Sequence, residues 1–151
     1  MSKVFSLILR IGEESHEVKY DFPLPPTNFE MIKAWHEKFA PKVIRGELGF
    51  PYKAEEELRL RLMLEELDEL WQAMQVKSIL DVADGIGDLL WVTYSCALAY
   101  GIDADAVVAE INKSNWSKLW PDGEPHYRED GKIIKPEVGY EPPNLQQVLG
   151  L

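Results

Sequence analysis

Apolar residues recur every three or four positions over several stretches of the chain, which is the spacing of one face of an α-helix. A polar break at positions 77–78 divides the longest of these stretches in two. The pattern therefore predicts four helices, which cover about residues 29–39, 54–76, 79–100 and 103–116. Residues suited to cap these helices stand where the chain needs them: Thr27 or Asn28, Ser78 and Asp103 at the starts, and Gly101 at an end.

Both ends of the chain lack the helical pattern. Residues 4–11 and 16–22 carry apolar side chains around a polar turn, which predicts a β-hairpin. Prolines then form a stiff linker. Beyond residue 121 we expect an irregular tail with one short strand at 132–134. The chain is thus expected to be all-α in three parts: a hairpin and linker (1–26), a helical domain (27–120) and a tail that contributes basic residues (121–151).

Two blocks of acid lie on the predicted helices 54–76 and 79–100. Glu65 and Glu69 share a helix face with Glu66 beside them, and Asp84 and Asp88 form a similar pair. If the two helices pack antiparallel, these carboxylates converge, and such a cluster suits hard divalent cations. The alternative is two ordinary solvated helix faces.

Two glycines favour the metal site over that alternative. Gly85 and Gly87 lie inside a predicted helix, where each costs about 1 kcal/mol relative to alanine. A glycine at such a position commonly permits the close approach of a backbone or a ligand. The long loop over residues 41–52 is expected to cover the site, because long loops are often functional.

A second group of polar residues ends the last predicted helix. Asn112 and Asn115 share a face and Lys118 follows, so amides and an ammonium group are available to phosphate oxygens. A merely polar helix end is an equally good interpretation. Lys132 and Lys135 in the tail could also meet a phosphate or belong to a solvated turn. Four tryptophans are expected in the core or at a subunit interface: Trp35, Trp71, Trp91 and Trp116.

Composition narrows the function further. The chain of 151 residues has a net charge of −10, which disfavours a nucleic-acid polymer as partner but leaves phosphorylated small molecules open. Its lone cysteine, Cys96, fits a reducing compartment. The N-terminal apolar run is interrupted by charges and the longest apolar stretch is too short for a bilayer, so neither a signal peptide nor membrane association is expected. A phosphate-binding Gly-rich loop, a nucleophile elbow and a histidine-based metal motif are missing from the sequence.

The acidic blocks resemble a known motif. Glu65-Glu66-x-x-Glu69, followed by Asp88-Leu89-Leu90, is similar to the all-α nucleoside triphosphate pyrophosphohydrolases, the MazG-like proteins, which include dimeric dUTPases and phosphoribosyl-ATP pyrophosphohydrolases. The residues from Gly101 to Lys118 and from Asp130 to Pro136 resemble a phosphoribosyl-ATP pyrophosphohydrolase-like branch of bacteria and phages. The resemblance covers about residues 27–143. The family's second motif has a glutamate where this chain has Gly85, and we expect Asp84 to supply that carboxylate.

The resemblance implies a fold, a reaction and a site. The fold is an antiparallel four-helix bundle completed in a homodimer or homotetramer. The reaction is hydrolysis of a nucleoside triphosphate to a monophosphate and pyrophosphate in the cytoplasm of a bacterium or a phage-infected host. Mg²⁺, or Mn²⁺ in its place, would be held by Glu65, Glu66, Glu69, Asp84 and Asp88. Glu66 and Glu69 would be catalytic, with Glu66 activating the water. Substrate would be held by Asn112, Asn115, Lys118, Lys132 and Lys135.

Two alternatives remain at this point. One is a non-catalytic helical protein whose acids bind a metal ion or a basic partner, which the Gly85 departure favours. The other is a phosphoribosyl-ATP pyrophosphohydrolase, with the same chemistry on another substrate.

Overall fold

The computed structural model describes residues 2–11 and 14–151, and these residues are mostly helical. Its helices are α1 (Asn28–Phe39), α2 (Lys53–Val76), α3 (Ile79–Tyr100), α4 (Ala104–Trp116) and α5 (Leu145–Leu149). Its strands are β1 (Ser2–Ile11), β2 (Glu14–Pro23), β3 (His126–Tyr127) and β4 (Ile133–Ile134). Within this part of the chain, every helix is too short or too polar to cross a membrane.

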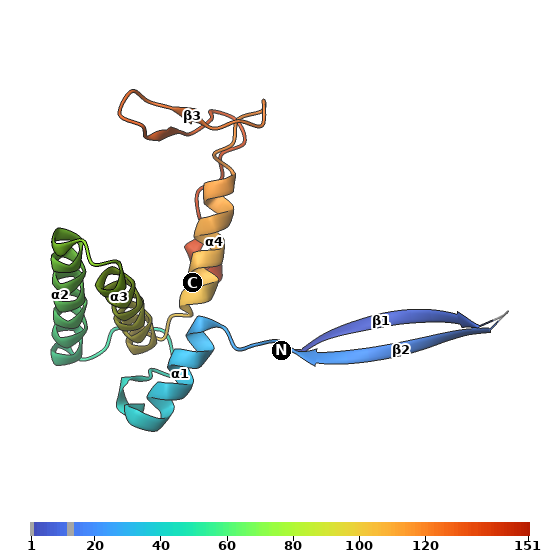
Figure 1. Cartoon of the computed structure of the whole chain (residues 1–151), viewed down its shortest axis with the longest axis horizontal. Coiled ribbons are helices and arrows are strands. Elements are labelled where there is room, and N and C mark those ends of the chain that lie inside the picture. The colour runs from blue at the N-terminus through green and yellow to red at the C-terminus, as the bar shows by residue number, and fades with distance from the viewer. Residues whose placement is uncertain (1, 12–13) are drawn as a thin grey trace.

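The most extensive contact between helices is that of α2 with α3, which lie side by side (Figure 1). Only Lys77 and Ser78 separate the two helices, so the chain reverses at once and the helices run antiparallel. Lys77 takes a left-handed conformation with φ of 57°, and the Ser78 hydroxyl accepts a hydrogen bond from the Asp81 N–H at 3.4 Å. The predicted helix break and the Ser78 cap are confirmed.

Helix α1 crosses α3 near the C-terminal end of α3. A capping box at Thr27 starts α1, since its hydroxyl accepts from the Glu30 N–H and the Glu30 carboxylate accepts from the Thr27 N–H. Ile32 is buried, and the Trp35 ring meets the Trp91 ring of α3 edge-on at 5.4 Å. Two of the four tryptophans thus join α1 to α3, and all four are at least partly exposed, Trp71 and Trp116 the most.

The loop between α1 and α2 packs on the end of α3 that is far from the acidic block. The Arg45 N–H donates to the Leu98 carbonyl and the Gly49 N–H to the Tyr100 carbonyl, each at 3.0 Å. Asp81 and Asp88 lie in the first half of α3, at its other end. The expectation that residues 41–52 cover the carboxylates of their own chain is therefore wrong, because the backbone donors of the loop are satisfied by the last turn of α3.

Helix α4 is held to α1 and α3 at its N-terminal end and does not pack along α2. The Asp105 carboxylate accepts from the Tyr94 hydroxyl of α3 at 2.7 Å and from the Phe29 N–H of α1 at 3.1 Å. From this junction α4 stands apart from α2 and leads to the tail (Figure 1). Asp103 caps α4, as predicted.

The tail is more ordered than predicted. The expected short strand is present as β4, paired antiparallel with β3. Helix α5 was not expected from the sequence; its cap is Asn144, whose side chain accepts from the Gln147 N–H at 3.1 Å, and it ends at Gly150. The Asn144 N–H also donates to the Glu110 carboxylate at 2.8 Å, so the end of the chain folds back along α4.

Two predicted features remain predictions. Strands β1 and β2 pair antiparallel, from Ser2 opposite Pro23 to Ile11 opposite Glu14. Residues 12 and 13 of the expected turn lie outside the described residues, so the closed hairpin is not established. The antiparallel four-helix bundle is also untested, since α2 and α3 form a pair, α1 crosses α3, and α4 stands apart.

The apolar core of the described chain is small. Its buried apolar side chains are Ile32, Leu70, Ala73, Leu98 and Ala99. Large apolar side chains stay exposed on the outer face of α2, among them Leu60, Leu64, Leu67, Trp71 and Met74. A soluble helical protein rarely leaves so much apolar surface in one place unless another molecule covers it.

Candidate active site

Acidic side chains lie on the facing surfaces of α2 and α3. Asp81, Asp84 and Asp88 follow one another at intervals of three and four residues, which places them on one face of α3. Glu66 and Glu69 are three residues apart on α2. Because the connection between the helices is so short, the end of α2 and the start of α3 lie side by side, and the two acidic faces meet.

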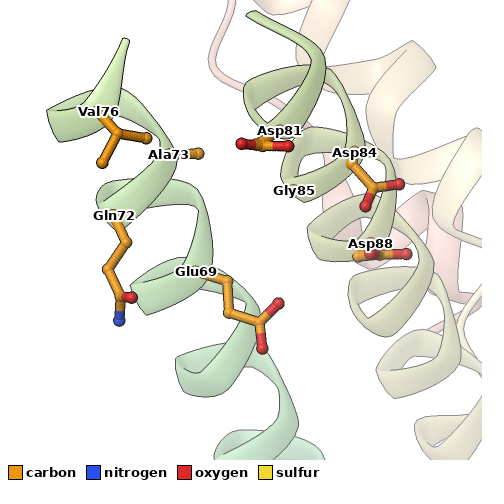
Figure 2. A pocket seen from close by; sticks show the side chains of 8 residues that line it. All are labelled: Glu69, Gln72, Ala73, Val76, Asp81, Asp84, Gly85 and Asp88. Carbon is orange, nitrogen blue, oxygen red and sulfur yellow. The ribbon is translucent and has the colours of Figure 1, made fainter. Parts of the chain in front are cut away.

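A pocket of about 480 Å³ opens between these faces (Figure 2). Figure 2 shows Glu69 of α2 directed toward α3, and Asp81 of α3 directed toward α2. The pocket is lined by Glu69, Gln72, Ala73, Val76, Asp81, Asp84, Gly85 and Asp88. Four of these eight residues are acids and none is basic, so the pocket has a strongly negative potential.

Glu66 belongs to the same acidic group. Burial raises the pKa of its carboxyl group, and the negative charges of Asp88, Glu69, Glu65 and Asp84 raise it further. These carboxylates are therefore close enough to repel one another. A cation bound among them would relieve that repulsion.

Two predicted ligands, Glu65 and Glu66, do not line the pocket that holds Glu69, Asp84 and Asp88. Glu65 is exposed, and the Arg61 guanidinium lies 3.8 Å from its carboxylate on the same helix. Conversely, Asp81, which was not among the predicted ligands, lines the pocket. Its spacing to Asp84 and Asp88 places it on the same face of α3.

The donor set suits Mg²⁺ or Mn²⁺, which prefer oxygen ligands. As the side chains stand, no three His, Cys, Asp or Glu residues within 2–11 and 14–151 are close enough to share one metal ion. Mg²⁺ commonly binds through one or two carboxylates together with water and substrate phosphates, so it does not need such a cage. The residues present fit a metal ion that is bound together with an anionic substrate.

Gly85 explains the departure from the family motif. It is buried between the helices, and a Cβ at this position would lie 3.1 Å from the Cα and from the Cβ of Leu70. A glutamate here would have to push α2 away. At Gly87, two residues further on, a Cβ would have nothing within 4 Å, so close helix packing accounts for only one of the two glycines. Asp84 lines the pocket next to Gly85, where it is available as the replacement carboxylate.

The predicted substrate residues divide into two sets. The Lys118 ammonium donates to the Asn115 side-chain oxygen at 2.6 Å, and the Lys135 ammonium lies 4.3 Å from the centre of the Tyr140 ring. These residues gather where the tail meets the end of α4. Two others lie outside this group: Asn112 is exposed on α4, and Lys132 is in the turn before β4, where its N–H donates to the Asp130 carboxylate.

Tyr140 is a residue of this region that the sequence did not indicate. Its approach to Ser114 and Lys118 depends on the return of the tail to α4. No local pattern in the sequence predicts that the tail folds back onto α4.

One comparison, with models of protein families, gives a match that covers the acidic helices. The family model for phosphoribosyl-ATP pyrophosphohydrolase matches residues 33–115, which is more than half of the chain. The match runs from α1 through the acidic helices to Asn115 of α4. A search of curated proteins found no match. The resemblance to a pyrophosphohydrolase acting on a nucleotide is therefore confirmed, and the chain belongs to the phosphoribosyl-ATP pyrophosphohydrolase family, within the MazG-like all-α superfamily.

Proposed function

We propose that this protein hydrolyses nucleoside triphosphates between the α- and β-phosphates and releases a monophosphate and pyrophosphate. The observation that carries the proposal is the pocket in which Glu69, Asp84 and Asp88 meet. A pocket of this charge would repel a triphosphate on its own, so the reaction needs a divalent cation. When bound, Mg²⁺ or Mn²⁺ neutralises the phosphates and stabilises the negative charge that develops as the bond breaks.

The side chains have separate tasks in this scheme. Glu69, Asp84 and Asp88 line the pocket and would hold the metal through carboxylate oxygens, and Asp81 adds negative charge at the same pocket. Glu65 stays a predicted ligand, and it would have to leave Arg61 to act as one. Glu66 lies among these acids, where it orients the attacking water and accepts its proton.

The basic group at the end of α4 would hold the phosphates of the substrate. Asn115, Lys118 and Lys135 provide an amide and two ammonium groups. In Figure 1 α4, which leads to this basic group, stands apart from α2. Asn112 and Lys132 remain predicted contacts for other parts of the substrate.

A homodimer is the second part of the proposal. The exposed residues Leu60, Leu64, Leu67, Trp71 and Met74 follow one another at alternating intervals of four and three along α2, with exposed fractions of 47–59%. The same alternating intervals recur on α3, at the exposed residues Ile79, Ala83, Ile86 and Leu90. Alternating intervals of this kind form the seam through which helices pack in bundles. A second copy that contributes its own α2 and α3 would cover both seams and give the four-helix bundle.

One other substrate has a specific argument in its favour. Phosphoribosyl-ATP is named by the family model that matches residues 33–115. It carries the same triphosphate group, so the pocket and the basic group would serve it equally. The preference for this substrate or for ordinary nucleoside triphosphates depends on the protein groups that contact the nucleotide base.

The test is a substrate panel with the full chain. Phosphoribosyl-ATP and the canonical ribo- and deoxyribonucleoside triphosphates are each incubated with Mg²⁺, with Mn²⁺ and with chelator, and the products are separated by ion-exchange chromatography. Metal-dependent formation of a monophosphate and pyrophosphate supports the proposal. Release of orthophosphate would contradict cleavage at the α–β bond. The absence of product with every substrate, from folded protein that still binds Mn²⁺, would leave the non-catalytic metal-binding protein as the better explanation.

A further inference from the structure

The tail is fastened to the last turn of α4. The Ser117 hydroxyl donates to the Ser114 carbonyl oxygen at 2.8 Å and accepts from the Glu141 N–H at 2.9 Å. The Lys113 ammonium lies 3.6 Å from the Glu141 carboxylate. The Ser117–Glu141 hydrogen bond joins residues 24 positions apart in the sequence and, with the Lys113–Glu141 ion pair, holds residue 141 beside α4. The preceding residue, Tyr140, is thereby placed at the same helix end.

Tyr140 stands among positively charged and polar groups. The Lys135 ammonium lies 4.3 Å from the centre of its ring, in a cation–π contact. Hydrogen bonds from Lys135 and from Ser114, a buried residue of α4, lower the pKa of the Tyr140 phenol, and the charges of Lys135 and Lys118 lower it further. The acid beside it, Glu141, is paired with Lys113.

This arrangement has the composition of an anion-binding site. Two ammonium groups and a phenol O–H are donors, and the Asn115 amide orients Lys118 through the 2.6 Å hydrogen bond. Donors that carry charge make the strongest hydrogen bonds to phosphate oxygens. A phenol beside two ammonium groups is a better donor than a phenol in water, because the neighbouring charges favour the loss of its proton.

We propose that Tyr140 is a substrate-binding residue, whose hydroxyl donates to a phosphate oxygen held between Lys118 and Lys135. The proposal rests on the proposed function, because it names a further contact of the same substrate. The ring of Tyr140 keeps Lys135 in place, and its hydroxyl contacts the anion. The hydroxyl oxygen accepts from Lys135 and Ser114, and its O–H is left to donate to the anion.

The substitution Tyr140→Phe separates the two tasks, since it keeps the ring and removes the hydroxyl. Tyr127→Phe is the matched control, because Tyr127 is an exposed tyrosine of β3 that pairs with Ile133 of β4. The Lys118→Ala/Lys135→Ala double variant shows how much affinity the basic group supplies. Binding of inorganic tripolyphosphate to the full-length proteins is measured by calorimetry in chelator, well below their melting temperatures.

We expect Tyr140→Phe to weaken tripolyphosphate binding about tenfold, as the loss of a hydrogen bond to a charged group implies, and Tyr127→Phe to leave it unchanged. In hydrolysis assays Tyr140→Phe is expected to raise KM more than it lowers kcat, because the contact exists before the bond breaks. Equal tripolyphosphate affinity in Tyr140→Phe and the unaltered protein would overturn the proposal. So would equal affinity in the double lysine variant, since the site would then not exist.

The binding assay contains neither metal nor a cleavable nucleotide, so it separates this inference from the proposed function. Tight tripolyphosphate binding that needs the Tyr140 hydroxyl, in a protein that cleaves no triphosphate, would support the site and refute the reaction. Metal-dependent cleavage with the same KM in Tyr140→Phe would support the reaction and refute the role of Tyr140.

Discussion

Gly85 of α3 lies against Leu70 of α2 so closely that a Cβ on residue 85 would be 3.1 Å from the Leu70 Cα. This contact sets how near the two acidic faces approach each other. It also removes position 85 from the set of residues that can carry a carboxylate. The close packing of the two helices therefore explains why this chain has no glutamate at position 85.

Substitution of the two glycines of α3 by alanine should have opposite effects. Gly87→Ala is expected to stabilise the fold by up to about 1 kcal/mol, because alanine favours the helix and nothing lies within 4 Å of the new methyl group. Gly85→Ala is expected to destabilise it by about 1–3 kcal/mol, because the methyl group meets the backbone of Leu70. Urea unfolding of the two variants measures both values. Equal stability of the two variants would show that α2 and α3 are not in close contact at Gly85.

Restoring the family's glutamate should not improve the enzyme. Gly85→Glu places a longer side chain where even a methyl group is crowded, so the helices must separate and the pocket must widen. We expect lower stability than in Gly85→Ala and lower activity than in the unaltered chain. Higher activity, measured at a temperature where both proteins are folded, would mean that Asp84 does not replace the missing carboxylate.

Neutralising the pocket acids should abolish turnover without unfolding the protein. Glu69→Gln and Asp88→Asn keep the shape of each side chain and remove its charge, and kcat/KM is expected to fall at least ~100-fold in each. The apo proteins should be no less stable, because like charges repel in the pocket. Glu37→Gln, which alters an exposed carboxylate of α1, is the control and should keep full activity. Full activity in both pocket variants would place the reaction elsewhere.

A charge in the α2 seam should break the proposed dimer. Leu67 is 50% exposed in the single chain, and Leu67→Lys would bury an ammonium group between two copies of α2. We expect light scattering to report half the mass of the unaltered protein. Gln75→Lys adds the same charge to an exposed position of α2 just outside the seam and should leave the mass unchanged. A dimer that survives Leu67→Lys would have to use another surface.

The hydrogen bonds of the Asp105 carboxylate should make the free energy of unfolding depend on pH. Burial raises the pKa of this carboxyl group, but hydrogen bonds from Thr27, Tyr94 and the Phe29 N–H outweigh burial and leave the pKa below its ordinary value. The carboxylate therefore contributes stability above the unfolded-state pKa of about 3.9, and this contribution is lost as pH falls through the lower folded-state value. After solvent screening it should be on the order of 1 kcal/mol.

Thermal melting of Asp105→Asn against pH tests this junction. The variant is expected to melt below the unaltered protein at pH 7, and the difference is expected to shrink as the pH falls below 4. A difference that stays constant from pH 7 to pH 3 would mean that the charge of Asp105 does not matter.

The parts of the fold that the sequence predicted depend on local physics. Thr27, Ser78 and Asp103 cap helices because their side chains reach backbone N–H groups three residues ahead. The sequence could predict that Glu69 lies opposite Asp84 and Asp88, because a two-residue connection favours antiparallel packing of the two helices. Helical spacing and one short turn were enough to predict where these acids lie.

The parts that escaped prediction depend on contacts between distant residues. Gly85 and Gly87 are indistinguishable in sequence, and only the position of Leu70 gives them different roles. Tyr140 reaches α4 through a hydrogen bond between Glu141 and Ser117, which no periodic pattern encodes. Helix α5 has only five residues, too few for a helical period to stand out, although Asn144 and Gly150 are suitable end signals.

The two-residue connection between α2 and α3 also determines when the acids meet during folding. Contacts between neighbours in sequence form faster than contacts that close long loops, so we expect this helical hairpin to form before the tail reaches α4. Glu66, Glu69, Asp84 and Asp88 would then be brought together early, while the tail lysines are still distant. The rate of refolding should rise with ionic strength, because dissolved ions screen the repulsion that the folding hairpin must overcome.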